Sequence, residues 1–307
     1  MRNGIHQLVV LLVMAFNTCL DAFTFTTVPQ RTASTLLSTQ HVIHTVDGIT
    51  FREVTIDINM VGPVTILEAT AESQEELVEM ALALDDEELA RSSQLNAGDP
   101  YGAVLWPAAS AIANHLLTKC APLSGLTILE LGTGTGLVSI AAAIGGAGRI
   151  IATDYESVPL KLIAYAAEKL NGNSLAIETS LLDMCDSSIP LPSADIVVAA
   201  DVMYEPITGT AVAHRTVEAL RRGSRVLVGD SPGRAGRPAF LAELSRLGVH
   251  HEGFIDTVGR TCSGPRHELI CGKGSTSISE TPMELAVAIL DLDPVTAFEK
   301  HETNQLK

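Results

Sequence analysis

The chain has 307 residues, of which 46% are hydrophobic, and a formal net charge of −16 at pH 7. This length and apolar content suffice for one large or two small folded domains and exclude a chain that is disordered throughout. The negative charge argues against nonspecific binding of nucleic acid, which needs clusters of Lys and Arg. It would attract a basic partner, such as a protein surface that carries lysines, although acidity also serves solubility alone.

The first 45 residues are expected to be a targeting presequence. Residues 1–22 contain one early Arg and a short apolar run, which is the shape of a signal peptide rather than of a stable membrane anchor. Residues 23–45 are rich in Ser and Thr and hold no acidic residue, which is transit-peptide composition. Together they resemble the bipartite presequences of plastids acquired by secondary endosymbiosis. A mitochondrial presequence and plain secretion are the alternatives.

Residues 46–98 are expected to form an N-terminal extension. Apolar and polar residues alternate over residues 48–68 around a central Gly-Pro pair, which predicts a β-hairpin. Residues 73–89 have the period of an amphipathic helix, capped by Ser73 with Glu76 three residues later. The helix is strongly acidic, so its charged face is either solvated or a docking surface for a basic protein.

The most informative stretch runs from residue 126 to Asp154. It reads as a buried strand over residues 126–131, a turn with Gly132, Gly134 and Gly136, a small-residue helix over residues 137–144 and a second strand over residues 149–153 that ends on Asp154. A βαβ unit of this kind binds a nucleoside-sized ligand at the carboxyl ends of its strands, where the Asp154 carboxylate could accept hydrogen bonds from ribose hydroxyls. The third glycine comes one residue too early for the dinucleotide fingerprint, so the spacing disfavours NAD.

The rest of the chain continues to alternate between helices and strands. Helices are expected over residues 108–117, 157–170, 208–220 and 238–247, and strands over residues 174–180, 194–200 and 224–229. The strand over residues 194–200 is almost wholly apolar, as a central parallel strand should be. A final antiparallel pair is expected over residues 250–258 and 267–272, followed by a linker and a last helix over residues 283–300.

Four segments in this order carry a family resemblance. They are the G-x-x-x-W-P segment ending at Pro107, the E-x-G-x-G-x-G run from Glu130, the D-x-x-Y segment from Asp201 to Tyr204, and the D-S-P-G-R segment from Asp230. The set resembles class I, seven-β-strand, S-adenosylmethionine-dependent methyltransferases, and among them the protein-lysine methyltransferases. The last segment is close to the G-D-P-G-R of the members that act on the β subunit of electron transfer flavoprotein, with a serine inserted.

The resemblance implies an α/β fold over residues 99–272: a Rossmann-like, doubly wound seven-stranded sheet with an antiparallel last strand, preceded by a short α+β extension. It implies S-adenosyl-L-methionine as the cofactor. The residues that it places around the cofactor lie at the glycine turn and at the ends of neighbouring strands: Trp106, Glu130, Gly132, Gly134, Asp154, Asp183 and Ala200. Asp183 would accept a bond from the adenine amine, and Trp106 would cover the ligand or fill the core.

The implied reaction is transfer of a methyl group to a lysine ε-amine of a protein. This amine must be neutral to attack, and an ordinary lysine pKa is about 10.4, so a desolvating pocket should lower the pKa. Asp201 is expected to accept a hydrogen bond from the amine, and Tyr204 to shape the apolar wall. The cysteines lack metal-ligand spacing, so no metal site is expected. A small-molecule N- or O-methyltransferase and a non-catalytic cofactor-binding protein are the alternatives.

Overall fold

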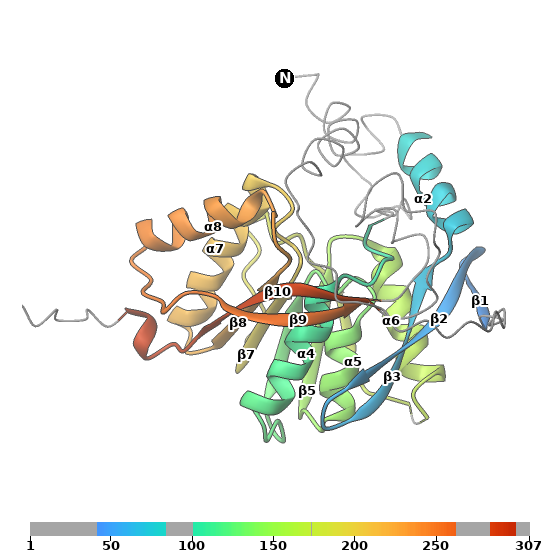
Figure 1. The fold of residues 1–307 in the computed structure, drawn as a ribbon, viewed down its shortest axis with the longest axis horizontal. Helices are drawn as coiled ribbons and strands as arrows, with labels where there is room; N and C mark the ends of the chain where they lie inside the picture. Colours follow the sequence, from blue (N-terminus) through green and yellow to red (C-terminus); the bar gives the residue numbers. More distant parts are fainter. Residues whose placement is uncertain (1–41, 84–100, 173, 262–282, 299–307) are drawn as a thin grey trace, which may run out of the picture.

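The computed structural model of the chain describes residues 42–83, 101–172, 174–261 and 283–298. These residues form two β-sheets and the helices that pack on them (Figure 1). The expected presequence up to residue 41, the expected strand over residues 267–272 and the linker after it lie outside the described residues. Within the described ranges, none of the helices has both the length and the apolar character needed to span a bilayer.

The larger sheet has seven strands in the order β6-β5-β4-β7-β8-β10-β9. Their bounds are β4 Thr127–Leu131, β5 Arg149–Asp154, β6 Glu178–Leu181, β7 Ile196–Ala200, β8 Arg225–Asp230, β9 Ile255–Thr261 and β10 Met283–Leu292. Strands β6, β5, β4, β7 and β8 run parallel, and β10 is antiparallel to both of its neighbours. The chain moves outward from β4 to β6 and then returns to β7. Ligands of such sheets bind at the carboxyl ends of the strands where the order reverses, which is at β4.

Helices cover both faces of this sheet. They are α4 Pro107–Lys119, α5 Leu137–Ile144 and α6 Ser157–Lys169 on one face, and α7 Pro206–Arg221 and α8 Gly236–Arg246 on the other. Successive residues of a strand point to opposite faces, so Ile128 shares a core with α4 and α5, whereas Leu129 shares a core with α7 and α8. The fold class expected from the sequence is confirmed.

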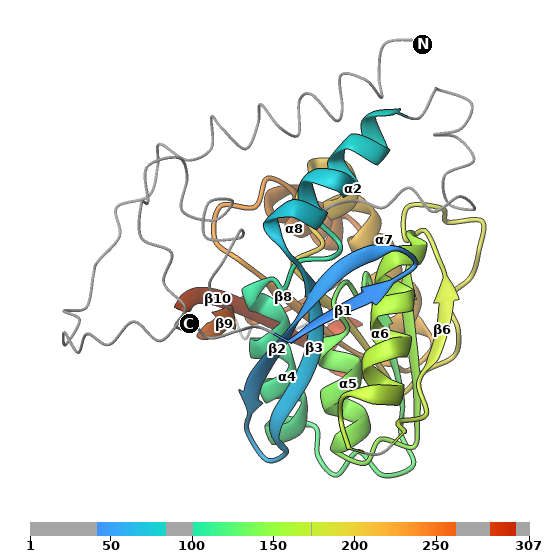
Figure 2. The same cartoon turned by 90° about the vertical axis from the view of Figure 1, so that its right-hand side faces the viewer.

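The smaller sheet is antiparallel and lies at the N-terminus. It contains β1 Ile43–Val46, β2 Ile49–Ile58 and β3 Gly62–Ala69, and its hairpin confirms the alternation in the sequence. Figure 2 shows β2 and β3 lying across α4, α5 and α6, and some of their apolar residues belong to the same core as α4 and α5: Val54, Ile56, Ile58, Val64 and Ile66. The first strand begins at Ile43, so the last residues of the segment expected to be a presequence pair with β2.

Helix α2 (Ala71–Ala83) begins two residues earlier than expected. The backbone N–H of Thr70 donates to the Ser73 hydroxyl at 2.8 Å, and the backbone N–H of Ser73 donates to the Thr70 hydroxyl at 3.2 Å. The two residues therefore cap the helix reciprocally, and Thr70 takes the position that the sequence pattern assigned to Ser73. Both are good capping residues, so the pattern alone did not separate them. The expected residues 84–89 of this helix lie outside the described part of the chain.

The C-terminal part of the sequence interpretation was wrong. The segment Met283–Leu292, expected to be a helix outside the methyltransferase fold, is β10 and lies between β8 and β9. Ile289 pairs with Gly229 on one side and with Ile255 on the other. A continuous apolar run is compatible with a buried strand or a buried helix, and here the partners on both sides decide. Strand β9 also begins later than expected, and the fold extends to β10 rather than ending at residue 272.

Candidate functional site at the carboxyl ends of β4, β5, β7 and β8

The turn after β4 requires glycine. Gly132 and Gly134 have φ values of +66° and +52°, which side chains rarely adopt. A Cβ atom on Gly132 would lie 2.6 Å from Cγ1 of Val202, and one on Gly134 would lie 3.2 Å from the carbonyl oxygen of Gly102. Both the backbone conformation and the close packing of Val202 and Gly102 therefore require glycine at these two positions.

The side chain of Glu130 holds the glycine turn in place through hydrogen bonds. Its side chain is 2% exposed, and Oε2 accepts hydrogen bonds from the Thr133 hydroxyl at 2.8 Å and from the backbone N–H of Ser139 at 3.1 Å. Burial raises the pKa of Glu130 to about 7, although these hydrogen bonds lower it and the charge of Asp154 adds to the rise. The geometry gives Glu130 a bracing role between the turn and α5 rather than the ligand contact expected from the sequence.

Asp154 and the glycine turn are brought together as expected. The Asp154 carboxylate lies at the end of β5 and accepts the backbone N–H of Gly134 at 3.1 Å and that of Glu156 at 3.1 Å. Both acidic groups that bond to residues of this turn, Glu130 and Asp154, would repel a phosphate. They suit a ligand that offers hydroxyl donors and a positive charge, and S-adenosylmethionine has both.

Asp183 reaches the same edge from β6. The backbone N–H of Leu182 donates to the carbonyl oxygen of Asp154 at 2.9 Å, so the segment after β6 begins beside the end of β5. The exposed side chain of Asp183 accepts the backbone N–H of Cys185 at 2.8 Å and closes a tight turn. The methyl group of Met184 would be 3.3 Å from a Cβ on Gly132, so this loop extends over the glycine turn.

The N-terminal sheet holds the segment that ends in Trp106. Glu68 of β3 is buried, pairs with Arg52 at 2.7 Å and accepts the backbone N–H of Leu105 at 3.0 Å. The backbone N–H of Ala69 donates to the carbonyl oxygen of Ala103 at 2.9 Å. The extension therefore positions the loop before α4, a role that its sequence alone did not indicate.

Trp106 is half-buried and anchored on two sides. Its indole N–H donates to the carbonyl oxygen of Tyr101 at 3.1 Å. The guanidinium carbon of Arg234 lies 4.5 Å from the centroid of the indole ring, which is a cation–π contact. One face of the ring is therefore occupied by the arginine of the D-S-P-G-R segment, and sequence reasoning did not link these two residues.

Asp201 lies at the junction of three segments. It has a left-handed φ of +57° and a side chain with 0% exposure. Its Oδ2 accepts the backbone N–H of Ala108 at 2.8 Å, and its Oδ1 accepts that of Ser231 at 2.8 Å and lies 3.4 Å from Nε of Arg234. Both oxygens already have donors. The carboxylate therefore joins the start of α4 to the ends of β7 and β8, and this is not the expected role of bonding the substrate amine.

Ala200 and Tyr204 flank this junction. Ala200 is half-buried at the end of β7 and pairs with Gly229 of β8. Tyr204 is half-buried in the segment between β7 and α7, where Glu205 and Thr208 cap the helix. Both residues lie at the carboxyl edge of the sheet, on the side of β4 opposite to Asp154.

Asp230 is a buried acid that the sequence interpretation named only as part of a motif. Its side chain has 0% exposure, and Oδ2 accepts a hydrogen bond from Nε of Arg237 at 2.9 Å. Burial, with the nearby charge of Asp201, raises the pKa of Asp230 to about 7, although Arg237 and Arg234 oppose the rise. Two carboxylates and two guanidinium groups thus lie together where β7 and β8 end.

Parts of this chain are similar to known proteins. The family described as lysine methyltransferase matches residues 83–246. The electron transfer flavoprotein beta subunit lysine methyltransferases of Mus musculus and Homo sapiens are 32% and 31% identical over 152 and 156 residues, which is 48% and 50% of this chain and 55% of each relative. Protein N-lysine methyltransferase METTL21A of Danio rerio is 34% identical over 146 residues, covering 46% of this chain and 66% of the relative.

This chain spans about half the length of the electron transfer flavoprotein enzymes that it matches. The family match covers more than half of the 307 residues and includes the glycine turn, Asp154 and the Asp201 junction. The chain belongs to the lysine methyltransferase family.

Proposed function

We propose that this protein transfers a methyl group from S-adenosylmethionine to the ε-amine of a lysine in another protein. The observation that carries the proposal is the contact of the Asp154 carboxylate with Gly134 at the switch point of the sheet, in a chain of the lysine methyltransferase family. When bound, the cofactor supplies a methyl group activated by its sulfonium.

The cofactor would lie across the carboxyl ends of β4, β5 and β7. In this proposal Asp154 accepts hydrogen bonds from the ribose hydroxyls, and Asp183 accepts one from the exocyclic amine of adenine. The positive φ values of Gly132 and Gly134 shape the turn whose backbone would border the methionine part. The proposed cofactor-binding set is completed by Trp106 and Ala200, which would border the ligand, and by Glu130, which braces the glycine turn.

The acceptor lysine would enter beside Trp106 and Tyr204. Its amine must lose a proton to solvent before its lone pair attacks the methyl carbon and S-adenosylhomocysteine leaves, and two features of this edge favour the neutral form. The aromatic side chains exclude water, and the Arg234 guanidinium beside the Trp106 ring disfavours a second positive charge. Tyr204 forms the wall of the pocket, and Asp201 positions α4 and β8 around it. Most of the rate would come from holding the amine in line with the methyl group.

The substrate is proposed to be a basic, lysine-bearing protein. The net charge of −16 and the acidic α2 would attract such a partner. The relatives differ in what their names say they act on, and one of the names refers to the beta subunit of electron transfer flavoprotein. We propose an organelle as the location, on the composition of residues 1–45, with the plastid ahead of the mitochondrion.

A labelling experiment tests the reaction class. The protein is incubated with S-adenosylmethionine labelled in the methyl group and with an organellar lysate, and the products are separated. Label in a protein band, on lysine after hydrolysis, supports the proposal. Label in solvent-extractable material supports a small-molecule methyltransferase instead. Retention of the cofactor with no transfer supports a binding protein.

A further inference from the structure

A fully buried arginine holds the loop that follows β6. Arg215 lies on α7 and is 2% exposed. It occupies the buried stripe of the helix, in line with Thr208, Val212 and Ala219 at the spacing of helical turns. A guanidinium in such a position is stable only if its donors are satisfied, because burying an unpaired charge is costly.

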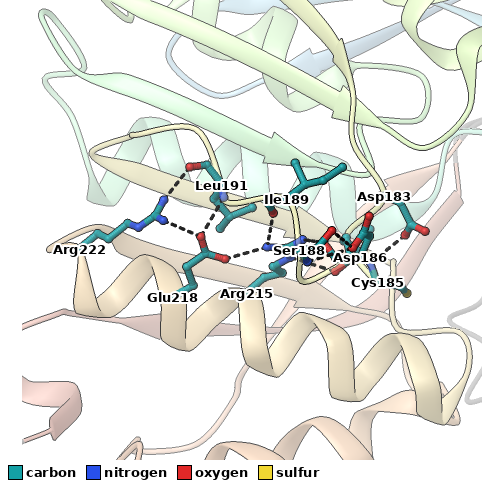
Figure 3. Close-up of polar contacts among 10 residues, drawn as sticks. Asp183, Cys185, Asp186, Ser188, Ile189, Leu191, Arg215, Glu218 and Arg222 are labelled. Carbon is teal, nitrogen blue, oxygen red and sulfur yellow. Dashed lines mark hydrogen bonds and ion pairs between the residues drawn. The ribbon is translucent and has the colours of Figure 1, made fainter.

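The guanidinium is satisfied by backbone carbonyl groups of one loop (Figure 3). Its Nε donates to the carbonyl oxygen of Met184 at 3.0 Å, and Nη1 donates to that of Ile189 at 2.8 Å. Its Nη2 donates to the carbonyl oxygen of Asp186. An ion pair with Glu218, at 2.8 Å, completes the set. One side chain thus binds three carbonyl groups across six consecutive residues.

The far end of the loop is tied to the same helix. Glu218 accepts the backbone N–H of Leu191 at 2.8 Å, and Arg222 donates to the carbonyl oxygen of Leu191 at 2.6 Å. Within the loop, Asp183 accepts the N–H of Cys185. The path of the loop from Asp183 to Leu191 is therefore determined by contacts with α7.

This loop carries Asp183 of the proposed cofactor site and Met184, which lies over the glycine turn. Asp183, the proposed partner of the adenine amine, is one residue before Met184, whose carbonyl oxygen Arg215 holds. The Met184 methyl group lies over the turn at Gly132. The Met184 carbonyl, which Arg215 holds, and the N–H of Cys185, which donates to Asp183, belong to one planar peptide group. Holding the carbonyl therefore fixes the direction of this N–H, and this limits where the Asp183 side chain can point.

We propose that Arg215 is a positioning residue that sets adenine recognition by orienting Asp183. The inference rests on the proposed function, because it takes the cofactor to be an adenine nucleoside bound at this edge. Lysine cannot replace Arg215 without loss, since its ammonium lacks the planar fork that reaches several carbonyl oxygens at once. The substitution Arg215→Lys would leave some of these carbonyl groups without their donor from α7, and the loop would relax.

The test measures preference between two ligands by calorimetry on the full chain. The ligands are S-adenosylhomocysteine and S-inosylhomocysteine, in which an oxo group replaces the adenine amine. The wild-type protein should prefer the adenine ligand by about tenfold or more, the value of one hydrogen bond to a charged group. Asp183→Asn and Arg215→Lys should each reduce the preference to about twofold or less. The two substitutions together should reduce it no further, because residues that act through one contact are not additive.

Arg221→Lys is the matched control. Arg221 lies on the same helix but contacts the ring of Phe298, at 6.0 Å, and this variant should keep the full preference. If Arg215→Lys lowers the melting temperature but keeps the preference, Arg215 is a structural residue only and the inference is overturned. If wild type binds neither ligand, the proposed function itself fails, which is a different result.

A second measurement covers the case in which Arg215→Lys does not fold. Hydrogen exchange of the wild-type amides of Cys185 and Leu191 is followed with each ligand at saturation. These amides should be protected more strongly by the adenine ligand than by the inosine ligand, since only the first engages Asp183. Equal protection by the two ligands would overturn the inference.

Discussion

The Asp201 carboxylate accepts the backbone N–H of Ala108 at 2.8 Å, although the two residues are 93 positions apart in the chain. Ala108 is in the first turn of α4, where backbone N–H groups have no partner within the helix and the helix dipole favours a negative charge. The same carboxylate bonds Ser231 after β8. The buried Asp201 side chain thus links the start of α4, which follows Trp106, to the segment after β8, which contains Arg234. Trp106 and Arg234 form the cation–π contact between these two segments.

Replacing Asp201 should therefore destabilise the fold as well as slow the reaction. Asp201→Asn removes the charge and substitutes an amide nitrogen for one of two oxygens that face N–H donors. We expect a loss of about 1.5–3 kcal/mol in the free energy of unfolding, the usual value of a buried hydrogen bond to a charged group. Urea denaturation measures this, with the exposed Asp256→Asn as the control. Lost turnover with unchanged stability would instead return Asp201 to a direct role at the amine.

Asp154→Ala should weaken cofactor binding. The substitution removes the acceptor of the ribose hydroxyls, and each charge-assisted bond lost should cost about 1.5–3 kcal/mol of binding free energy. Calorimetry with S-adenosylhomocysteine measures the change, and Asp57→Asn, an exposed acid of β2, should bind as the wild type does. An unchanged affinity in Asp154→Ala would remove this residue from the ligand site.

Glu130 should make stability depend on pH in the neutral range. Its pKa is raised by burial to about 7 from the usual 4.5, so between these values the folded state binds more protons than the unfolded state. The stability of the wild type should fall as pH rises through this window and level off above it. Glu130→Gln cannot titrate and should lose the Glu130 part of this fall, whereas Asp230, whose pKa burial also raises to about 7, keeps its own part. Parallel pH profiles of the two proteins, measured by thermal unfolding, would contradict the buried, raised-pKa position of Glu130.

Asp291 should make stability depend on pH in the opposite direction, because its pKa is lowered rather than raised. Burial alone would raise its pKa, but hydrogen bonds from His115 and Arg225 outweigh this and lower the pKa to about 2 from 3.8. Its contribution to stability should be complete above the unfolded value and be lost as pH falls from about 4 to about 2. Asp291→Asn should remove this part of the acid transition.

The Asp291 experiment also tests the position of β10. The exposed pair of Arg149 and Glu178 serves as a comparison, because the effect of Glu178→Gln should fade in high salt whereas that of Asp291→Asn should persist. An acid transition that is the same in Asp291→Asn and in the wild type would argue against the contact between α4, β8 and β10.

The local sequence pattern predicted the βαβ unit of β4, α5 and β5 closely. It did not predict that residues 283–292 form strand β10. Helix α5 has the bounds expected for it, residues 137–144, because a glycine turn before it and Gly145 after it are local signals. The apolar run of β10 has no such signal. It becomes a strand because β8 and β9 flank it on both sides, and this information lies in distant parts of the chain.

In the site, too, local signals predicted some features, whereas features that depend on distant segments were missed. The sequence placed Asp154, Asp183 and Asp201 at the ends of strands, which a motif and a strand pattern can do. It did not predict that Asp201 is fully bonded to backbone, because its partners come from two other segments. A signal for Arg215 does exist, since it is an arginine in the apolar stripe of a helix, but only the structure identifies the loop that it holds.

A crystal structure of the protein with S-adenosylhomocysteine tests the central claim most directly. The account predicts the nucleoside across the ends of β4 and β5, with both ribose hydroxyls in hydrogen-bond contact with the Asp154 carboxylate and the adenine amine next to Asp183. A crevice blocked by side chains in the presence of saturating ligand, or a ligand bound away from Gly132 and Asp154, would contradict it.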